Sequence, residues 1–169
     1  MTKVLQLLRR RITAGLLGAA AATTLSAQSV TTTLSNGPGS TSRTTTVTGA
    51  NGKTATYQHN AESGNGSYTA NRTVTGFNGK TGTSSTTASY APGSTSRQTT
   101  VTGFNGRSAN YNNSRSWGNG TYSDTRTHTG FNGLTHAGAV TRSGGLVTNT
   151  YTGRGGTSRS VTRLARFRR

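Results

Sequence analysis

The sequence predicts an all-β protein made of repeated strand-turn-strand units, and two observations support this class. The motif TVTGANG at 46–52 recurs as TVTGFNG at 73–79 and 100–106 and as THTGFNG at 127–133, a constant period of 27 residues. Turn-forming pairs such as Asn-Gly, Gly-Gly and Pro-Gly return about every 13 residues, separated by segments rich in Thr, Ser, Val and Tyr. β-Branched residues favour strands, and Asn-Gly favours tight hairpin turns. A fixed period of this size indicates units that stack or pair in series.

The repeat has a second level of 54 residues. Residues 39–90 align with residues 93–144 without a gap, and 28 of the 52 aligned positions are identical. The natural unit is therefore a pair of 27-residue repeats. Residues 39–90 belong to the first unit and residues 93–144 to the second.

Two kinds of side chain alternate within the predicted strands. In the segment 67–75, every second residue is apolar or basic, and Thr or Asn stands between them: the first set is Tyr68, Ala70, Arg72 and Val74. Successive strand residues point to opposite faces, so one face is expected to be weakly apolar and the other rich in hydroxyl and amide groups. The repeated arginines are expected on the apolar face. This face contains few large apolar residues, so burial at roughly 25 cal/mol per Å² supplies only a thin core.

Two architectures fit this pattern, a β-solenoid and a long antiparallel meander. In a meander, each Asn-Gly turn closes a hairpin. In a solenoid, each 27-residue unit forms one coil, and residues 27 apart stack into ladders that stabilise neighbouring strands. The ladder residues would be Asn51, Asn78, Asn105 and Asn132, and Phe77, Phe104 and Phe131. The sequence leaves both alternatives open.

The first 27 residues are predicted to be an export signal. A basic start is followed by an apolar stretch of small residues and by Ser26-Ala27, where a signal peptidase would cleave. The apolar run 12–22 is shorter than the ~20 residues of a membrane-spanning helix. Three consecutive arginines at 9–11 leave the twin-arginine route open beside the general one. The predicted organisation is an export signal at 1–27, a β-repeat domain at 28–153 and an Arg-rich tail at 154–169.

The charge balance predicts attraction to polyanions. The chain has 19 Lys and Arg residues against two acids, for a formal charge of +17, and the chain beyond the signal would carry +13. Lipopolysaccharide, acidic polysaccharide and extracellular DNA are the expected anionic partners. The predicted tail concentrates this charge in six arginines, which are candidate polyanion-binding residues: Arg154, Arg159, Arg163, Arg166, Arg168 and Arg169. The chain has no Cys, so disulfides do not contribute to its stability.

The sequence offers little for catalysis. Glu62 and Asp124 are the only acids, and they form no recognisable acid-base pair. Asp124 and His128 share one strand face, but His128 stands where the repeat has Val. The three histidines lack the spacing of a metal site, and the Gly-rich turns lack the helix of a phosphate or dinucleotide fingerprint. We therefore expect a noncatalytic protein without a metal, cofactor or small-molecule substrate.

The chain from Val30 to about Arg163 resembles secreted bacterial repeat proteins of the curlin kind. The likeness lies in short strand-turn-strand repeats and in Gly-Asn-Gly turns at 64–66 and 118–120. Curlin repeats are shorter and carry regularly placed Gln, which is almost absent here. The resemblance implies assembly into amyloid-like fibres, and no functional residue is carried over.

The leading expectation is an exported structural repeat protein of the cell surface or extracellular matrix that self-assembles into β fibres. It would reside in the periplasm, at the cell surface or outside the cell. Free strand edges would template further copies. The candidate assembly contacts are Phe77, Phe104, Phe131 and Trp117, with Asn51, Asn78, Asn105 and Asn132.

Other functions remain open from the sequence. One alternative is a polyanion-binding module that uses the repeat arginines and the tail. A minor alternative is ice binding by ranks of threonine, as in Thr-ranked antifreeze solenoids; the ranks are Thr44, Thr46 and Thr48 beside Thr73 and Thr75, and Thr100 and Thr102. Low hydrophobicity and high charge also fit a chain that orders only on contact with a surface.

Overall fold

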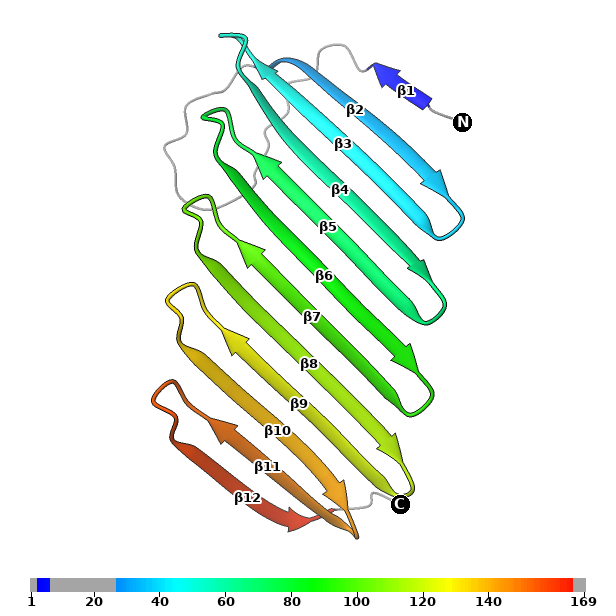
Figure 1. Cartoon of the computed structure of the whole chain (residues 1–169), viewed down its shortest axis with the longest axis vertical. Coiled ribbons are helices and arrows are strands. Elements are labelled where there is room, and N and C mark those ends of the chain that lie inside the picture. The colour runs from blue at the N-terminus through cyan, green and yellow to red at the C-terminus, as the bar shows by residue number, and fades with distance from the viewer. Residues whose placement is uncertain (1–2, 7–26, 166–169) are drawn as a thin grey trace.

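The computed structural model describes residues 3–6 and 27–165, which form one open antiparallel sheet without helices (Figure 1). Each strand pairs with its neighbours in sequence, in the order β1 to β12. In these ranges no helix is long and apolar enough to cross a membrane. The strands are β1 (Lys3–Gln6), β2 (Ala27–Gly37), β3 (Ser40–Gly49), β4 (Thr54–Gly64), β5 (Ser67–Thr75), β6 (Thr81–Ala91), β7 (Ser94–Thr102), β8 (Ser108–Gly118), β9 (Thr121–Thr129), β10 (Thr135–Ser143), β11 (Leu146–Thr152) and β12 (Ser158–Leu164).

The all-β class is confirmed, and the strand order is that of the meander alternative. In this order, residues 27 apart lie on alternate strands, such as Thr73 on β5 and Thr100 on β7. Their separation is about 9.6 Å, or two strand spacings, rather than the 4.8 Å of directly paired strands. The side-chain ladders of a solenoid are therefore not formed across adjacent strands here.

Two-residue turns close the hairpins at one end of the strands, here called the short-turn edge of the sheet. Asn65 and Gly66 have φ angles of 50° and 71°, which is the type I′ geometry that follows the natural twist of a hairpin. Asn119-Gly120 and Gly144-Gly145 also have two positive φ angles. In the turns Pro38-Gly39 and Pro92-Gly93 only the glycine has a positive φ, because proline is held at a negative φ. Short turns on this edge fix the register of each strand pair.

Longer turns lie at the opposite end of the strands, here called the long-turn edge. These turns repeat one hydrogen-bond pattern. In the first, the Gly49 N–H donates to the Lys53 carbonyl at 2.8 Å, and the Lys53 N–H donates to Asn51 Oδ1 at 3.1 Å. The backbone bond recurs in the turns that begin at Gly76, Gly103, Gly130 and Gly153. The motif found in the sequence is thus a turn that builds itself from local contacts.

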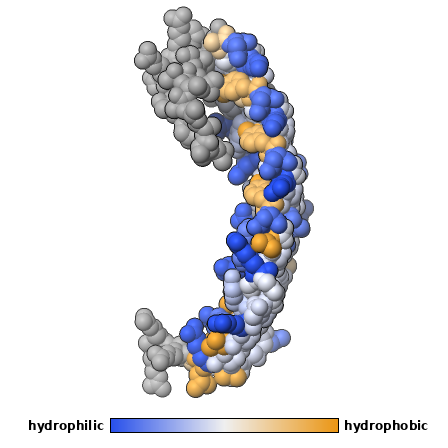
Figure 2. Space-filling view, turned by 90° about the vertical axis from the view of Figure 1, so that its left-hand side faces the viewer, coloured by the Kyte–Doolittle hydropathy of each residue, from blue (hydrophilic) through white to orange (hydrophobic). Residues whose placement is uncertain are grey.

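The sheet is a single curved layer (Figure 2). Among the described residues, Ala70 and Ala88 are the only buried apolar residues, and no side chain is fully buried. This agrees with the thin core expected from composition. Backbone pairing between strands therefore supplies most of the order, because apolar burial is small.

The sheet does not stop at the predicted end of the repeat domain. Gly153 opens the last turn, and β12 pairs with β11 along its whole length, so residues up to Leu164 belong to the sheet rather than to a separate tail. The Ser-x-Ser-x-Thr alternation of β12 continues the strand pattern, which explains the extension. Most of the predicted export signal lies outside the described residues; within it, β1 pairs with β2.

Candidate functional site

The strand register places every arginine of the described strands on one face of the sheet, here called the arginine face. Arg43 on β3 lies opposite His59 on β4, which lies opposite Arg72 on β5. Four arginines recur through the 54-residue repeat and are called the four repeated arginines: Arg43, Arg72, Arg97 and Arg126. The face also carries Arg115, Arg142, Arg159 and Arg163. Against these eight cations, Asp124 is the only acid on this face in the described residues.

The opposite face, called the hydroxyl face, carries Thr, Ser, Asn and Gln almost without interruption. Glu62 is its one charged strand residue within the described chain. Hydroxyl groups on neighbouring strands bond to each other, as in Thr129 and Thr135 at 2.8 Å and Thr150 and Ser160 at 2.8 Å. The two faces of the sheet therefore differ sharply in charge.

Asp124 is the most enclosed charged group of the arginine face, with 5% of its surface exposed. Arg126 donates to its carboxylate at 2.9 Å, Arg115 at 3.2 Å and the Asn113 amide at 2.7 Å. Hydrogen bonding to Arg126 lowers the pKa of Asp124 below its ordinary value of 3.8, against the opposing effect of burial, and Asn113 adds to the lowering. The cluster thus holds one carboxylate firmly ionised.

Stability is expected to depend on pH through Asp124. Its folded pKa is depressed, so its contribution is fully present above the unfolded pKa near 3.8 and is lost as the pH falls through the folded value. Thermal unfolding followed by circular dichroism from pH 5 to pH 2 should show the melting temperature fall below pH 4. The Asp124→Asn variant should show a smaller fall over the same range, and an equal fall in both chains would contradict the assignment.

The Asp124 cluster is present in the second 54-residue unit and has no counterpart at the equivalent positions of the first. Ala61 and Ala70 are direct cross-strand partners on β4 and β5, and Ala70 is 6% exposed. Fifty-four residues later, the same register pairs Arg115 with Asp124. The second unit therefore holds an ion pair where the first has two alanines.

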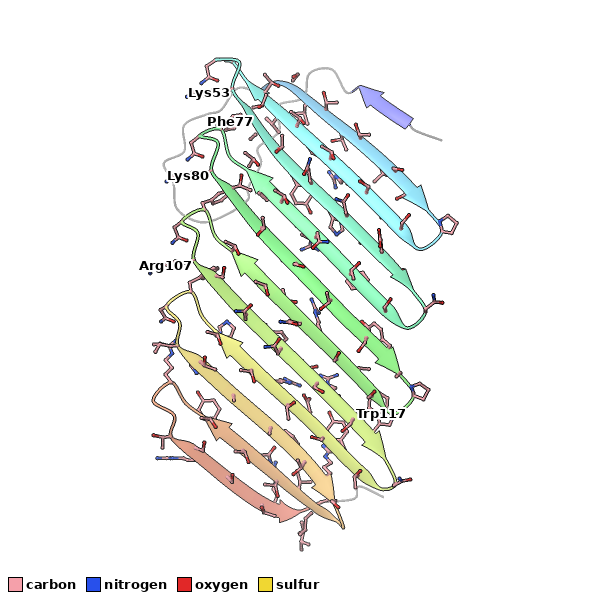
Figure 3. All side chains as sticks on the ribbon, viewed as in Figure 1. Lys53, Phe77, Lys80, Arg107 and Trp117 are labelled. Carbon is pink, nitrogen blue, oxygen red and sulfur yellow. The ribbon has the colours of Figure 1, made fainter. Side chains whose placement is uncertain are left out.

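The predicted aromatic contacts lie at both edges of the sheet (Figure 3). Phe77 approaches Gly49 of the preceding turn, where a Cβ would lie 3.6 Å from the ring, and Phe131 stands similarly near Gly103. Phe104 covers Gly82 at the start of β6. These rings thus connect successive turns of the same chain. Phe104 and Phe131 are nearly half exposed, which leaves them a free surface.

The predicted asparagine contacts have a local role. Asn51, Asn78, Asn105 and Asn132 each accept a backbone N–H two residues ahead through the side-chain oxygen. Because this bond shapes the turn, it accounts for the recurrence of Asn without contact between molecules. Trp117, on the opposite edge, lies across from Tyr122 and is 46% exposed.

A row of cations follows the long-turn edge beside the phenylalanines. Lys53, Lys80 and Arg107 occupy the same position of three successive turns, as Figure 3 shows. Their spacing along the edge is expected to be about 9.6 Å, or two strand spacings. This row extends the positive charge of the arginine face around one edge.

The predicted tail arginines are divided among three places. Arg154 lies in the last turn, where its Nε donates to His136 Nε2 at 3.0 Å. Arg159 and Arg163 lie on the arginine face of β12. Arg166, Arg168 and Arg169 lie outside the described residues.

The described residues include three histidines and two acids. They contain no group of three His, Cys, Asp or Glu side chains that would hold a metal ion. The Asp124 carboxylate bonds to arginines, while His128 stacks on His136 with ring centroids 6.2 Å apart. Ser123 and Thr127 point to the hydroxyl face, away from Asp124.

Sequence reasoning placed the four repeated arginines on one face but missed half of the arginine face. The missed arginines also follow the two-residue alternation of their strands, so applying this alternation to every strand would have found them. They are Arg115, Arg142, Arg159 and Arg163. Arg142 lies 5.6 Å from the ring centre of its cross-strand partner Tyr122. Comparisons of the chain with protein-family models, with curated proteins and with solved structures give no significant match.

Proposed function

We propose that this protein is a noncatalytic binding scaffold whose arginine face and adjacent turn edge hold an acidic polymer. The observation that carries the proposal is the placement of eight arginines on one face with a single acid among them. Cations on both faces would suffice for solubility alone. Segregation to one face is instead the arrangement that meets an extended anionic chain.

The spacing of the cations supports a linear ligand. Arg43 and Arg72 are separated by two strand steps, and so are Arg97 and Arg126, which corresponds to about 9.6 Å. Tyrosines and histidines between them, such as Tyr57, His59 and Tyr111, offer flat apolar surface and polar groups. This combination suits sugar rings or bases that carry a negative charge at regular intervals.

An acidic polysaccharide is the ligand class we favour, because carboxylate is the anion that the arginine face already binds in Asp124. Lipopolysaccharide and extracellular DNA are the other polyanions expected from the charge. In keeping with the predicted export, the scaffold would act at the cell surface or in the matrix.

Salt dependence of binding tests this function. Affinity for polygalacturonate, measured by isothermal titration calorimetry, is expected to fall steeply between 50 and 200 mM salt, because binding releases counterions from the polymer. Neutral dextran of similar length is the control and should not bind. An affinity for polygalacturonate that does not change with salt would contradict the proposal.

Self-assembly is the second candidate function, and the uncharged strand β2 near the start of the sheet favours it. β12 has no partner on its outer side within the described sheet, but Arg159 and Arg163 protect this edge by charge. β2 carries no charged residue, and β1 covers its outer edge from Thr31 to Leu34. Removal of the predicted export signal would uncover that edge.

Electron microscopy tests assembly through β2. The chain starting at Gln28 is expected to form unbranched filaments or paired sheets, while the full chain stays dispersed because β1 covers the edge. Thr32→Lys, which adds a charge to the uncovered strand, should suppress the assemblies. Equal behaviour of the full and shortened chains would exclude this edge.

Ice binding is not part of the proposal. The hydroxyl face does present ranks of Thr, but the sheet is curved, and Figure 2 shows the bend along its whole length. A flat crystal plane would meet only a few strands of such a surface. Gln58 and Glu62 also interrupt the ranks on β4.

A further inference from the structure

One histidine of the arginine face stands out because it lacks a hydrogen-bond partner. His59 Nε2 is shielded from solvent, and no donor or acceptor in the described residues reaches it. His59 lies between Arg43 and Arg72, its direct cross-strand partners on either side. Direct partners have Cβ atoms about 5 Å apart, so both guanidinium groups can reach the same point above the histidine.

These two arginines have no acid to balance them. Within the described chain, every ion pair involves Asp124, and Glu62, the other acid, lies on the opposite face. Two like charges on the same face repel each other, and an anion placed between them would offset that repulsion. The first unit therefore has two cations with no acid paired to them, and a histidine nitrogen without a hydrogen-bond partner between them.

The second unit shows what occupies the equivalent place. Arg97, Asn113 and Arg126 repeat the register of Arg43, His59 and Arg72, 54 residues later. There the Asp124 carboxylate accepts hydrogen bonds from Asn113 at 2.7 Å and from Arg126 at 2.9 Å. In the first unit, Ala70 stands at the Asp124 position and Ala61 at the Arg115 position. Arg72 keeps the place of Arg126, and His59 takes the place of Asn113.

We infer that Arg43, His59 and Arg72 form a binding site for one carboxylate group of an acidic ligand, which takes the place that Asp124 fills in the second unit. The site rests on the proposed function and deepens it, since it assigns a uronate-type carboxylate to a defined position of the arginine face. Arg72 corresponds to Arg126, which donates two hydrogen bonds to Asp124, and His59 corresponds to Asn113 as an N–H donor. Tyr68 corresponds to Tyr122, whose hydroxyl lies 3.4 Å from Asp124.

The repeat itself supplies the variants that test the site. Ala70→Asp introduces the carboxylate of the second unit and should fill the site from within. Ala70→Asn has nearly the same size without the charge, and it is the matched control. Asp124→Ala makes the reverse change, removing the built-in carboxylate and opening the equivalent site around Arg126.

The experiment is a titration of the full chain with sodium glucuronate, followed by the NMR signals of the His59 ring and of the Asn113 side-chain amide. His59 signals are expected to shift saturably in the native chain and in Ala70→Asn, and to stay still in Ala70→Asp. The Asn113 amide should respond only in Asp124→Ala. Equal responses of His59 in Ala70→Asp and Ala70→Asn, or no response of the native chain, would overturn the inference.

Binding of polygalacturonate by the same variants separates the site from the proposed function. If the polymer binds but glucuronate never shifts His59, the carboxylate site is wrong and the scaffold function stands. If glucuronate binds at His59 but the polymer does not bind, the proposed function fails and the site remains. Neutral glucose, which has the same ring without the carboxylate, should leave all signals unchanged.

Discussion

Replacing the four repeated arginines together by glutamine is expected to weaken polygalacturonate binding at 50 mM salt on the order of a hundredfold to a thousandfold, because each cation near an anionic surface contributes about 1 kcal/mol. The slope of log affinity against log salt should also become shallower, because fewer counterions are released when fewer carboxylates of the polymer are contacted. Calorimetry at three salt concentrations measures both quantities.

The matched control replaces the same four arginines by lysine. Lysine keeps the charge and the long side chain, so the salt slope should be preserved even though the planar donor geometry is lost. Circular dichroism must show unchanged strand content in both variants. If the glutamine chain binds as tightly as the native chain, the arginine face is not the binding surface.

Removing the Asp124 carboxylate is expected to destabilise the sheet. Asp124→Ala leaves Arg115 and Arg126 without their shared partner, but both guanidinium groups are about half exposed and can turn to water. The expected cost is therefore about 1–2 kcal/mol, below the penalty of a fully buried ion pair. Thermal and urea unfolding followed by circular dichroism would measure it.

The first unit provides the compensating variant. Arg115→Ala combined with Asp124→Ala recreates the cross-strand pair that Ala61 and Ala70 form 54 residues earlier. This double variant should be more stable than Asp124→Ala alone, because it removes one unpaired cation. Sodium acetate should stabilise Asp124→Ala more than the native chain, since a ligand that binds only the folded state raises its stability. Equal stability of the single and double variants would show that the unpaired Arg115 does not destabilise Asp124→Ala.

Much of this fold could be predicted from local sequence alone. The turn that begins at Gly49 is held by its own backbone and by Asn51. Because these contacts are local, the turn could be predicted wherever its sequence motif recurs. The placement of Arg72 and Thr73 on opposite faces of the sheet could likewise be predicted, because successive side chains of any single strand point to opposite faces. The predicted boundary at 153 was placed by composition, and β12 extends the sheet past it because backbone pairing with β11 does not require apolar residues.

The candidate site needed information that one strand does not contain. Asp124 meets Arg115 only because β8 and β9 pair in a particular register, and a shift of two residues would give it another partner. The place of His59 between two arginines depends on the same kind of pairing across three strands.

The sequence by itself determined the strands, the turns, the two chemically distinct faces and the excess of positive charge, because each follows from neighbouring residues or from composition. Only the tertiary structure decided between the solenoid and the meander, collected the eight arginines on one continuous face and enclosed Asp124 among its donors. The physical reason is that hydrogen bonds between strands join residues far apart in the chain, and their register selects which side chains become neighbours.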